Sequence, residues 1–208
     1  MSSFLGADYV AGTQADSYIT IYSNVTKAGR QDISQEPFHR WNFTLVLAPD
    51  ALGVEKLQTK VRIHRQTRGF ATPFKITCPL FDGMAEQPST KTFRCQTKHD
   101  AGVGRLTIRQ TAGTVPTTIE DGQWLRPSTA NKVYCVNEGA IITSLNSDVE
   151  IEIFPSLQAQ INALTTIIMN EVEATVVYDA GNRQFHWVHE SNLEGIYEPV
   201  LNLIEVIA

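Results

Sequence analysis

The middle of the chain contains a series of short β-type runs, and turn residues separate each run from the next. The runs are KTFRCQT, RLTIRQT, QWLRP, KVYCVN, AIITSL and VEIEIF. Short strands at close spacing, with no helical period among them, are typical of a small closed barrel or sandwich. The sequence therefore predicts a compact β-unit of about five strands over residues 86–158. The expected core positions are Leu106, Ile108, Val133, Ile142 and Ile151.

The regions on either side, residues 1–85 and 159–208, also contain runs rich in β-branched and aromatic residues. These runs are SYITIYSNVTK, RWNFTLVLA, PFKITCPLF, EATVVYD and GNRQFHWVHE. In RWNFTLVLA every second residue from Trp41 to Leu47 is aromatic or leucine. This alternation predicts a strand with one buried side.

One segment of the first region predicts a helix. Asp50 is of the type that caps helix N-termini, and Gly69 is of the type that ends helices. Leu57 and Val61 lie four residues apart between them and form an apolar seam. The sequence thus predicts a mainly β chain with one helix. A core shared by both outer regions would contain Trp41, Phe43, Leu57, Val61, Val176 and Trp187.

Charge is distributed unevenly along the chain. The region up to Gly83 holds nine lysines and arginines against seven acidic residues, whereas the region from Ala159 holds one against seven. Opposite charges allow two interpretations: the C-terminal strands pack near the helix of the same chain, or two surfaces meet between neighbouring subunits. Under the second interpretation, the candidate subunit interface is Arg62, Arg65 and Arg68 with Glu190, Glu194 and Glu198.

Composition limits the kinds of partner. A net charge of −5 argues against a protein dominated by phosphate contacts, so sequence-specific binding of nucleic acid is not expected. The sequence shows no signal-peptide pattern and no apolar stretch near the roughly 20 residues of a bilayer span, so membrane insertion is not expected. Cys78, Cys95 and Cys135 are odd in number and widely spaced, which predicts free thiols rather than a disulfide framework or a zinc site.

Residue types that catalyse reactions or bind metals form no convincing constellation. His186 and His189 are three residues apart in a predicted strand, so they point to opposite faces. Asp148, Glu150 and Glu152 form a row along one strand face, whereas a glycosidase needs two carboxylates in different environments across a cleft. A solvated face is the simpler interpretation of that row. No catalytic residue, cofactor or metal is therefore expected.

Aromatic residues of the middle unit leave an alternative open. Small barrels of the OB type bind sugars or oligonucleotides on aromatic surfaces, and Trp124 and Tyr134 could contact glycans in this way. That function requires at least one of the two rings to be exposed. The other interpretation is that Phe93 and Tyr134 belong to the core, while Trp124 sits at a turn and covers one end of the barrel.

Three segments together resemble the distal tail proteins of long-tailed bacteriophages. The first, RWNFTLVLAPDALGVEKLQTKVRIHRQTRGFATPFKITCPLF, has a Trp-led strand, a helix and an F-x-I-x-x-P strand. The second, IEDGQWLRP with NKVYCVN and VEIEIFPSL, is similar to the family's G-D-φ-φ, K-V-Y-x-V and I-x-I-x-P-x-L run, where φ is apolar. The usual G-D is reversed here as Asp121-Gly122. The third, RQFHWVHE with VLNLIEVIA, resembles the family's closing strands.

This resemblance implies both a fold and a structural role. The fold is a β-sandwich or split-barrel core of residues 1–85 and 159–208 with one flanking helix, interrupted by an OB-like barrel of residues 86–158. Copies of the chain would form a hexameric ring that joins the tail tube to the baseplate hub and other tail-tip proteins. Phage DNA would pass through the ring. The protein would assemble in the host cytoplasm and reside at the distal end of the virion tail.

Overall fold

The structure, a computed structural model, describes residues 10–18, 21–25, 31–35, 39–47, 72–78, 89–178 and 200–206. All secondary-structure elements in these residues are β-strands, which confirms the mainly β class. The predicted helix between Asp50 and Gly69 lies outside the described residues, as do the core candidates Leu57, Val61 and Trp187.

The chain divides into two compact units. One is discontinuous and takes Met1–Ile76 with Thr175–Val206, whereas the other consists mainly of Thr77–Ala174. We call them the sheet unit and the barrel unit.

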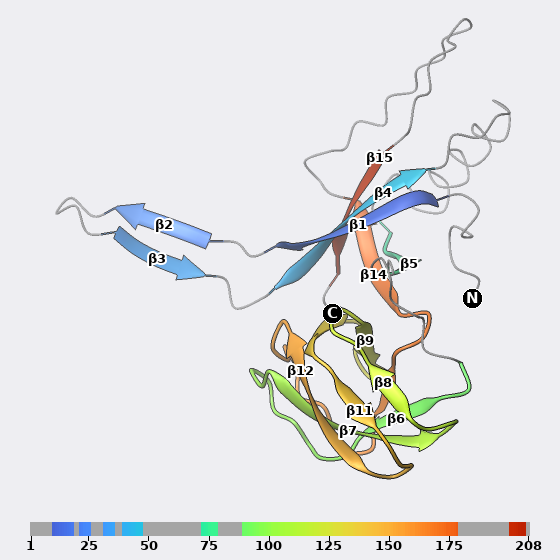
Figure 1. The fold of residues 1–208 in the computed structure, drawn as a ribbon. Coiled ribbons are helices and arrows are strands. Elements are labelled where there is room, and N and C mark those ends of the chain that lie inside the picture. The colour runs from blue at the N-terminus through green and yellow to red at the C-terminus, as the bar shows by residue number, and fades with distance from the viewer. Residues whose placement is uncertain are drawn as a thin grey trace, which may run out of the picture. The chain divides into compact units, whose positions relative to one another are not determined.

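The sheet unit is built on a five-stranded sheet with the order β1-β4-β15-β14-β5 (Figure 1). Its strands are β1 (Val10–Tyr18), β4 (Arg40–Leu47), β5 (Phe74–Thr77), β14 (Glu173–Tyr178) and β15 (Val200–Glu205). Trp41 and Phe43 of β4 are buried, while Asn42 between them is partly exposed, so the predicted alternation is confirmed for these residues. Phe43 pairs with Leu203 of β15, which is also buried. The first and last parts of the chain therefore share one core face.

A second, two-stranded sheet lies between β1 and β4 in the sequence. Strand β2 (Ile21–Val25) pairs antiparallel with β3 (Gln31–Gln35), and the register runs from Ile21 opposite Gln35 to Val25 opposite Gln31. The sequence indicated a β-type run from Ser17 to Lys27, and the described residues of this stretch belong to the end of β1 and to β2. We call the β2–β3 pair the ribbon (Figure 1).

The barrel unit is a closed barrel of six strands in the order β10-β12-β7-β6-β13-β9. The strands are β6 (Thr92–Cys95), β7 (Arg105–Ala112), β9 (Trp124–Pro127), β10 (Tyr134–Glu138), β12 (Asp148–Phe154) and β13 (Thr166–Ile168). All neighbouring pairs are antiparallel. Strand β8 (Thr117–Ile119) pairs with β11 (Ala140–Ile142) in a separate two-stranded sheet. A β-barrel in the middle of the chain is thus confirmed.

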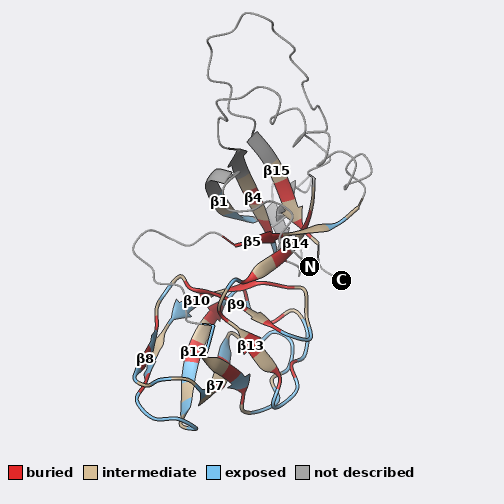
Figure 2. Ribbon diagram, turned by 90° about the vertical axis from the view of Figure 1, so that its right-hand side faces the viewer, coloured by how far each residue is buried: buried red, intermediate tan, exposed pale blue. Residues whose placement is uncertain are grey.

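The barrel core follows the predicted apolar positions. Along β7 and β12, buried residues alternate with exposed or partly exposed ones, as the colours of Figure 2 show. The five predicted core residues are each at most 1% exposed: Leu106, Ile108, Val133, Ile142 and Ile151. Period-two patterning was sufficient to identify them because each belongs to, or directly precedes, a strand with one inward face.

The predicted end of the barrel at Gln158 is wrong. Strand β13 lies beyond that residue, and its Ile167 pairs with both Phe93 of β6 and Pro127 of β9. The barrel therefore needs six strands, one more than the five of an OB fold. A three-residue strand carries too little alternation to be recognised in the sequence, and its role depends on partners far away along the chain.

The barrel is inserted between two adjacent strands of the sheet. Strand β5 leads into it, strand β14 leads out of it, and these two are neighbours in the sheet order. Their pairing continues beyond the strand ends, because the Cys78 N–H donates to the Val172 carbonyl oxygen at 2.8 Å. We call this pair of connecting segments the neck.

Excision of the barrel tests these boundaries. We expect the fragment Thr77–Ala174 to unfold in one cooperative transition in a circular-dichroism melt, because it contains all six barrel strands. The fragment of residues 86–158 is the matched control. It lacks β13, so β6 and β9 keep unpaired edges, and we expect aggregation or a non-cooperative melt. Equally cooperative melts of the two fragments would show that β13 is not needed to close the barrel.

Gly139 lies very close to the backbone of a neighbouring strand. Its N–H donates to the Asp121 carboxylate at 2.7 Å, and a Cβ atom at this position would fall on the carbonyl oxygen of Ile119. A larger side chain would have to push β8 and β11 apart.

Substitution of Gly139 by alanine measures this constraint. We expect Gly139→Ala to lower the free energy of unfolding by about 1–3 kcal/mol, the usual cost of overpacking. The control is Gly104→Ala, where the nearest atom to the new Cβ would be Ser156 Oγ at 3.6 Å, an ordinary contact. Urea unfolding of both variants makes the comparison, and equal stabilities would contradict the steric argument.

Candidate functional site

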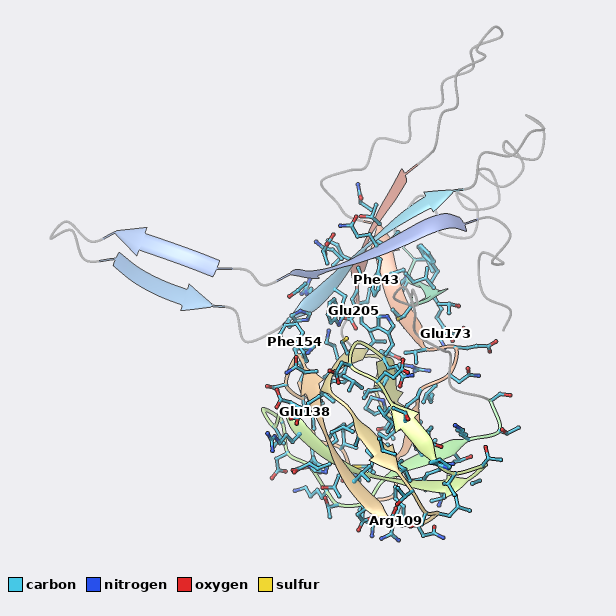
Figure 3. All side chains as sticks on the ribbon, in the orientation of Figure 1. Phe43, Arg109, Glu138, Phe154, Glu173 and Glu205 are labelled. Atoms are coloured by element: carbon cyan, nitrogen blue, oxygen red, sulfur yellow. The ribbon has the colours of Figure 1, made fainter. Side chains whose placement is uncertain are left out.

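Strands β7 and β12 carry a row of charged residues on the outside of the barrel. Asp148, Glu150 and Glu152 lie on one face of β12, directly opposite Arg109, Thr107 and Arg105 of β7. The Arg109 Nε atom donates to Asp148 Oδ1 at 2.7 Å. Arg105 lies 3.5–3.9 Å from the carboxylates of Glu138, Glu150 and Glu152. Arg109 and Glu138 lie toward opposite ends of the barrel (Figure 3).

The row has the properties of a solvated face, as the sequence predicted. The side chain of Glu150 is 60% exposed, and that of Asp148 is 43% exposed. The hydrogen bond from Arg109 lowers the pKa of Asp148 below its ordinary value. A general acid that works near neutral pH needs the opposite, a carboxyl group whose burial raises its pKa. The arrangement therefore supports surface ion pairs rather than acid–base chemistry.

The two aromatic residues proposed for glycan contact are buried. Trp124 is 4% exposed and Tyr134 is 1% exposed, so neither ring offers a face to a sugar. Tyr134 belongs to the barrel core together with Phe93, and its hydroxyl accepts the Gln158 N–H at 3.2 Å. Trp124 lies in β9, paired with Cys135, rather than at an exposed turn. The burial of both rings removes the observation on which the glycan-binding interpretation rested.

The three cysteines are free thiols, as predicted. Cys78 and Cys95 are buried and Cys135 is partly buried. Burial, together with the charge of the nearby Asp121, raises the pKa of Cys135 to about 11. Burial also raises the pKa of Cys95. Because the thiolate is the reactive form, Cys95 and Cys135 are poor nucleophiles and poor metal ligands at neutral pH.

Polar groups of the sheet unit connect its strands. The Ser17 Oγ atom lies 2.8 Å from His39 Nε2, and the buried His39 ring packs edge-on against Trp41 with their centroids 4.7 Å apart. The backbone N–H of Trp41 donates to the carboxylate of Glu205, and Glu205 is 1% exposed. These contacts join β1, β4 and β15. The sequence did not predict the contacts to Ser17 and Glu205, because these residues lie far from His39 and Trp41 along the chain.

His99 forms a contact at the end of the β6–β7 pairing that the sequence also did not predict. Its Nε2 atom accepts the Thr107 N–H at 3.1 Å and lies 3.1 Å from the Thr97 hydroxyl. The His99 backbone pairs with Ile161 through two hydrogen bonds of 2.9 Å. The imidazole nitrogen thus accepts a hydrogen bond that a backbone carbonyl oxygen would accept if the β6–β7 pairing continued. Only a ring with an unprotonated Nε2 can accept the Thr107 N–H.

Several predicted residues lie outside the described part of the chain. They are Arg62, Arg65, Arg68, His186, His189, Glu190, Glu194 and Glu198. In the part that is described, no helix is long and apolar enough to span a membrane. The same part brings together no group of three or more His, Cys, Asp or Glu side chains that could hold a metal ion.

Comparison with known proteins adds no family assignment. Models of known protein families give no match to the chain, and a search of curated proteins gives no relative.

The His99 contact predicts a pH dependence of stability. Burial lowers the pKa of His99 in the folded state, and Glu150 opposes this effect. The unfolded chain, whose histidine has an ordinary pKa of about 6.5, therefore takes up the proton more readily. The contribution of His99 to folding stability is fully present above the unfolded-state pKa of about 6.5. It is lost as the pH falls from there through the lower pKa of the folded state.

We expect His99→Gln to reduce the loss of stability between about pH 7 and pH 5 relative to the unsubstituted chain. Urea melts at several pH values measure the slope. Thr97→Val is the control, because it removes one neighbour of the ring and keeps the titrating group. An unchanged slope in His99→Gln would mean that His99 does not titrate differently in the two states.

Proposed function

We propose that this chain is a structural subunit of a bacteriophage tail, a distal tail protein. Copies of it form a ring that joins the tail tube to the baseplate and surrounds the DNA channel. The observation that carries the proposal is the insertion of a closed barrel between two adjacent strands of a discontinuous sheet unit. This is the arrangement that the sequence resemblance implies, apart from the sixth strand of the barrel.

The neck gives a physical reason why such an architecture suits an assembly protein. A barrel that enters and leaves through neighbouring strands leaves the hydrogen-bonded order of the sheet intact. The sheet unit can then make one set of contacts and the barrel another. A subunit that must bind its own copies as well as other tail proteins needs two such surfaces.

The ribbon supports the same proposal. A two-stranded sheet is only marginally stable by itself, so strands β2 and β3 gain stability if a further strand or surface covers them. A neighbouring subunit of a ring would provide such a surface. Closed rings are built from two different, complementary surfaces on each copy. The basic residues Arg62, Arg65 and Arg68 and the acidic residues Glu190, Glu194 and Glu198 are candidates for a second complementary pair.

The described polar sites favour this structural function over the alternatives. The carboxylate row is exposed and paired with Arg105 and Arg109, which does not suit a tail-associated hydrolase. The rings of Trp124 and Tyr134 are buried, which does not suit a glycan-binding module. An assembly protein requires neither kind of site.

Charge reversal tests the ring. We expect Arg65→Glu with Arg68→Glu to reduce incorporation of the protein into tails, because like charges would meet at the subunit contact. Circular dichroism should show that the variant subunit still folds. Electron microscopy of purified tails, with mass spectrometry of their protein content, measures incorporation.

The compensating control adds Glu194→Arg and Glu198→Arg to the same chain. If the two surfaces meet, this fourfold variant should recover incorporation. Normal tails from Arg65→Glu with Arg68→Glu would contradict the proposed contact. Absence of the unsubstituted protein from purified tails would contradict the function itself.

A further inference from the structure

Residues 97–103, which we call the arm, join β6 to β7 and pair with a third segment. Four backbone hydrogen bonds of 2.7–2.9 Å connect the arm to residues 157–161, through His99, Gly102, Val103, Leu157 and Ile161. All residues of the arm except His99 are exposed, whereas Leu157 and Ile161 belong to the barrel core. The arm therefore lies on the outside of the barrel, with little of its surface buried. A segment of this kind opens more easily than the core strands of the same barrel.

A single side chain ties the arm to β7. The His99 Nε2 atom accepts the backbone N–H of Thr107 at 3.1 Å. Gln96, just before the arm, continues the β6–β7 pairing by one more bond, from its N–H to the Thr107 carbonyl oxygen at 2.9 Å. Among the described residues, those of the arm form no other hydrogen bond or ion pair with β7. The His99 ring thus decides whether the arm stays attached to this strand.

Protonation of His99 removes this attachment. A neutral imidazole accepts a hydrogen bond at its unprotonated nitrogen, whereas an imidazolium donates from both nitrogens and accepts at neither. The protonated Nε2 and the Thr107 N–H would face each other as two donors 3.1 Å apart. The ring must then leave Thr107, and the arm loses its link to β7.

The charges around the ring give the imidazolium a partner. The ionisable side chains on the surrounding elements are Lys98 and Asp100 of the arm, Arg94 and Cys95 of β6, Arg105 and Arg109 of β7, and Asp148, Glu150 and Glu152 of β12. Residues 157–165 contain none. Lys98 and Asp100 neutralise each other in an ion pair at 3.0 Å. Glu150 lies directly opposite Thr107, and its charge favours the protonated ring.

We propose that the His99 ring is an acid-operated latch, which holds the arm closed when neutral and releases it on protonation while the six barrel strands stay paired. The released arm uncovers the backbone N–H groups of Leu157 and Ile161, which leaves an unpaired strand edge on the outside of the barrel. The barrel thus has a second conformation that acid favours. The latch concerns the barrel alone and does not rest on the proposed function.

Amide hydrogen exchange of the full-length chain tests the latch, when it is followed residue by residue by NMR between about pH 7 and pH 5. We expect the protection factors of Thr107 and Ile161 to fall about five- to twentyfold over this range. The reason is that the open form takes up a proton with the ordinary histidine pKa of about 6.5, whereas the pKa of the closed form is lower. The ring signal of His99 should titrate over the same range.

Leu164 provides the matched reference amide. Its N–H donates to the Cys95 carbonyl oxygen at 2.8 Å and does not involve the ring. Leu164 is 64% exposed, and its φ of 64° is strained for a leucine, so a general loosening of this end of the barrel would appear there as well. We expect its protection factor to stay unchanged. A parallel fall at Leu164 would mean that more than the arm opens, and would overturn the latch.

Two substitutions on the outside of the barrel test the role of charge. Glu150→Gln removes the carboxylate that favours the protonated ring, so the His99 titration and the loss of Thr107 protection should both move to lower pH. Glu138→Gln is the matched control, because Glu138 is also exposed and is also an ion-pair partner of Arg105, at 3.9 Å. We expect both curves to stay in place in the control.

Replacement of the ring itself completes the test. His99→Gln keeps a side chain that can accept the Thr107 N–H, but it removes the titrating group. The protection of Thr107 and Ile161 should then be independent of pH. A fall with acid that is as large in this variant as in the unsubstituted chain would overturn the proposal. So would a Thr107 amide that stays protected in the unsubstituted chain after its His99 ring has taken up a proton.

Discussion

The closure of the barrel by β13 is the constraint on which the rest of the barrel unit depends. An open sheet of short strands would leave backbone N–H and C=O groups unpaired at two edges, and such edges promote aggregation. Strand β13 pairs with β6 on one side and β9 on the other, so the described barrel has no open edge. It also fixes the position of the turn that carries Leu164, because Thr165 pairs with Cys95.

The position of β13 in the sequence decides where the inserted unit ends. Only a few residues separate β13 from β14, a strand of the sheet unit. The insertion must therefore leave the barrel immediately after its last strand. Strand β14 then lies beside β5 in the sheet, and the neck is closed by the hydrogen bond between Cys78 and Val172. Barrel closure and the two-stranded neck are thus consequences of the same short stretch of chain.

Several described residues with chemically active side chains take part in structural contacts or are covered. The carboxylates of β12 are paired with arginines, Cys95 and Cys135 are kept protonated by burial, and the His99 ring terminates a strand pairing. Leu164 is different, because its conformation and its exposure are both unfavourable for the isolated chain.

The sequence by itself determined the strands whose side chains alternate strongly, together with their buried positions. Strands β4, β7 and β12 and the core residues Leu106, Ile108 and Ile151 were predictable because period-two alternation is a local property. The exposed carboxylate row was predictable for the same reason. To predict these features, it was sufficient to know the residue types within a few positions of each other.

Only the tertiary structure decided which strands close the barrel, and which polar and aromatic residues are covered. Strand β13 has three residues and gains its role from β6 and β9, which lie far away in the sequence. Trp124 was expected at a turn that covers one end of the barrel, but it lies in β9, pairs with Cys135 of β10 and is buried. The strain at Leu164 arises because hydrogen bonds to Cys95 fix its backbone. Each of these features depends on partners brought together by the fold, and no local pattern in the sequence encodes such partners.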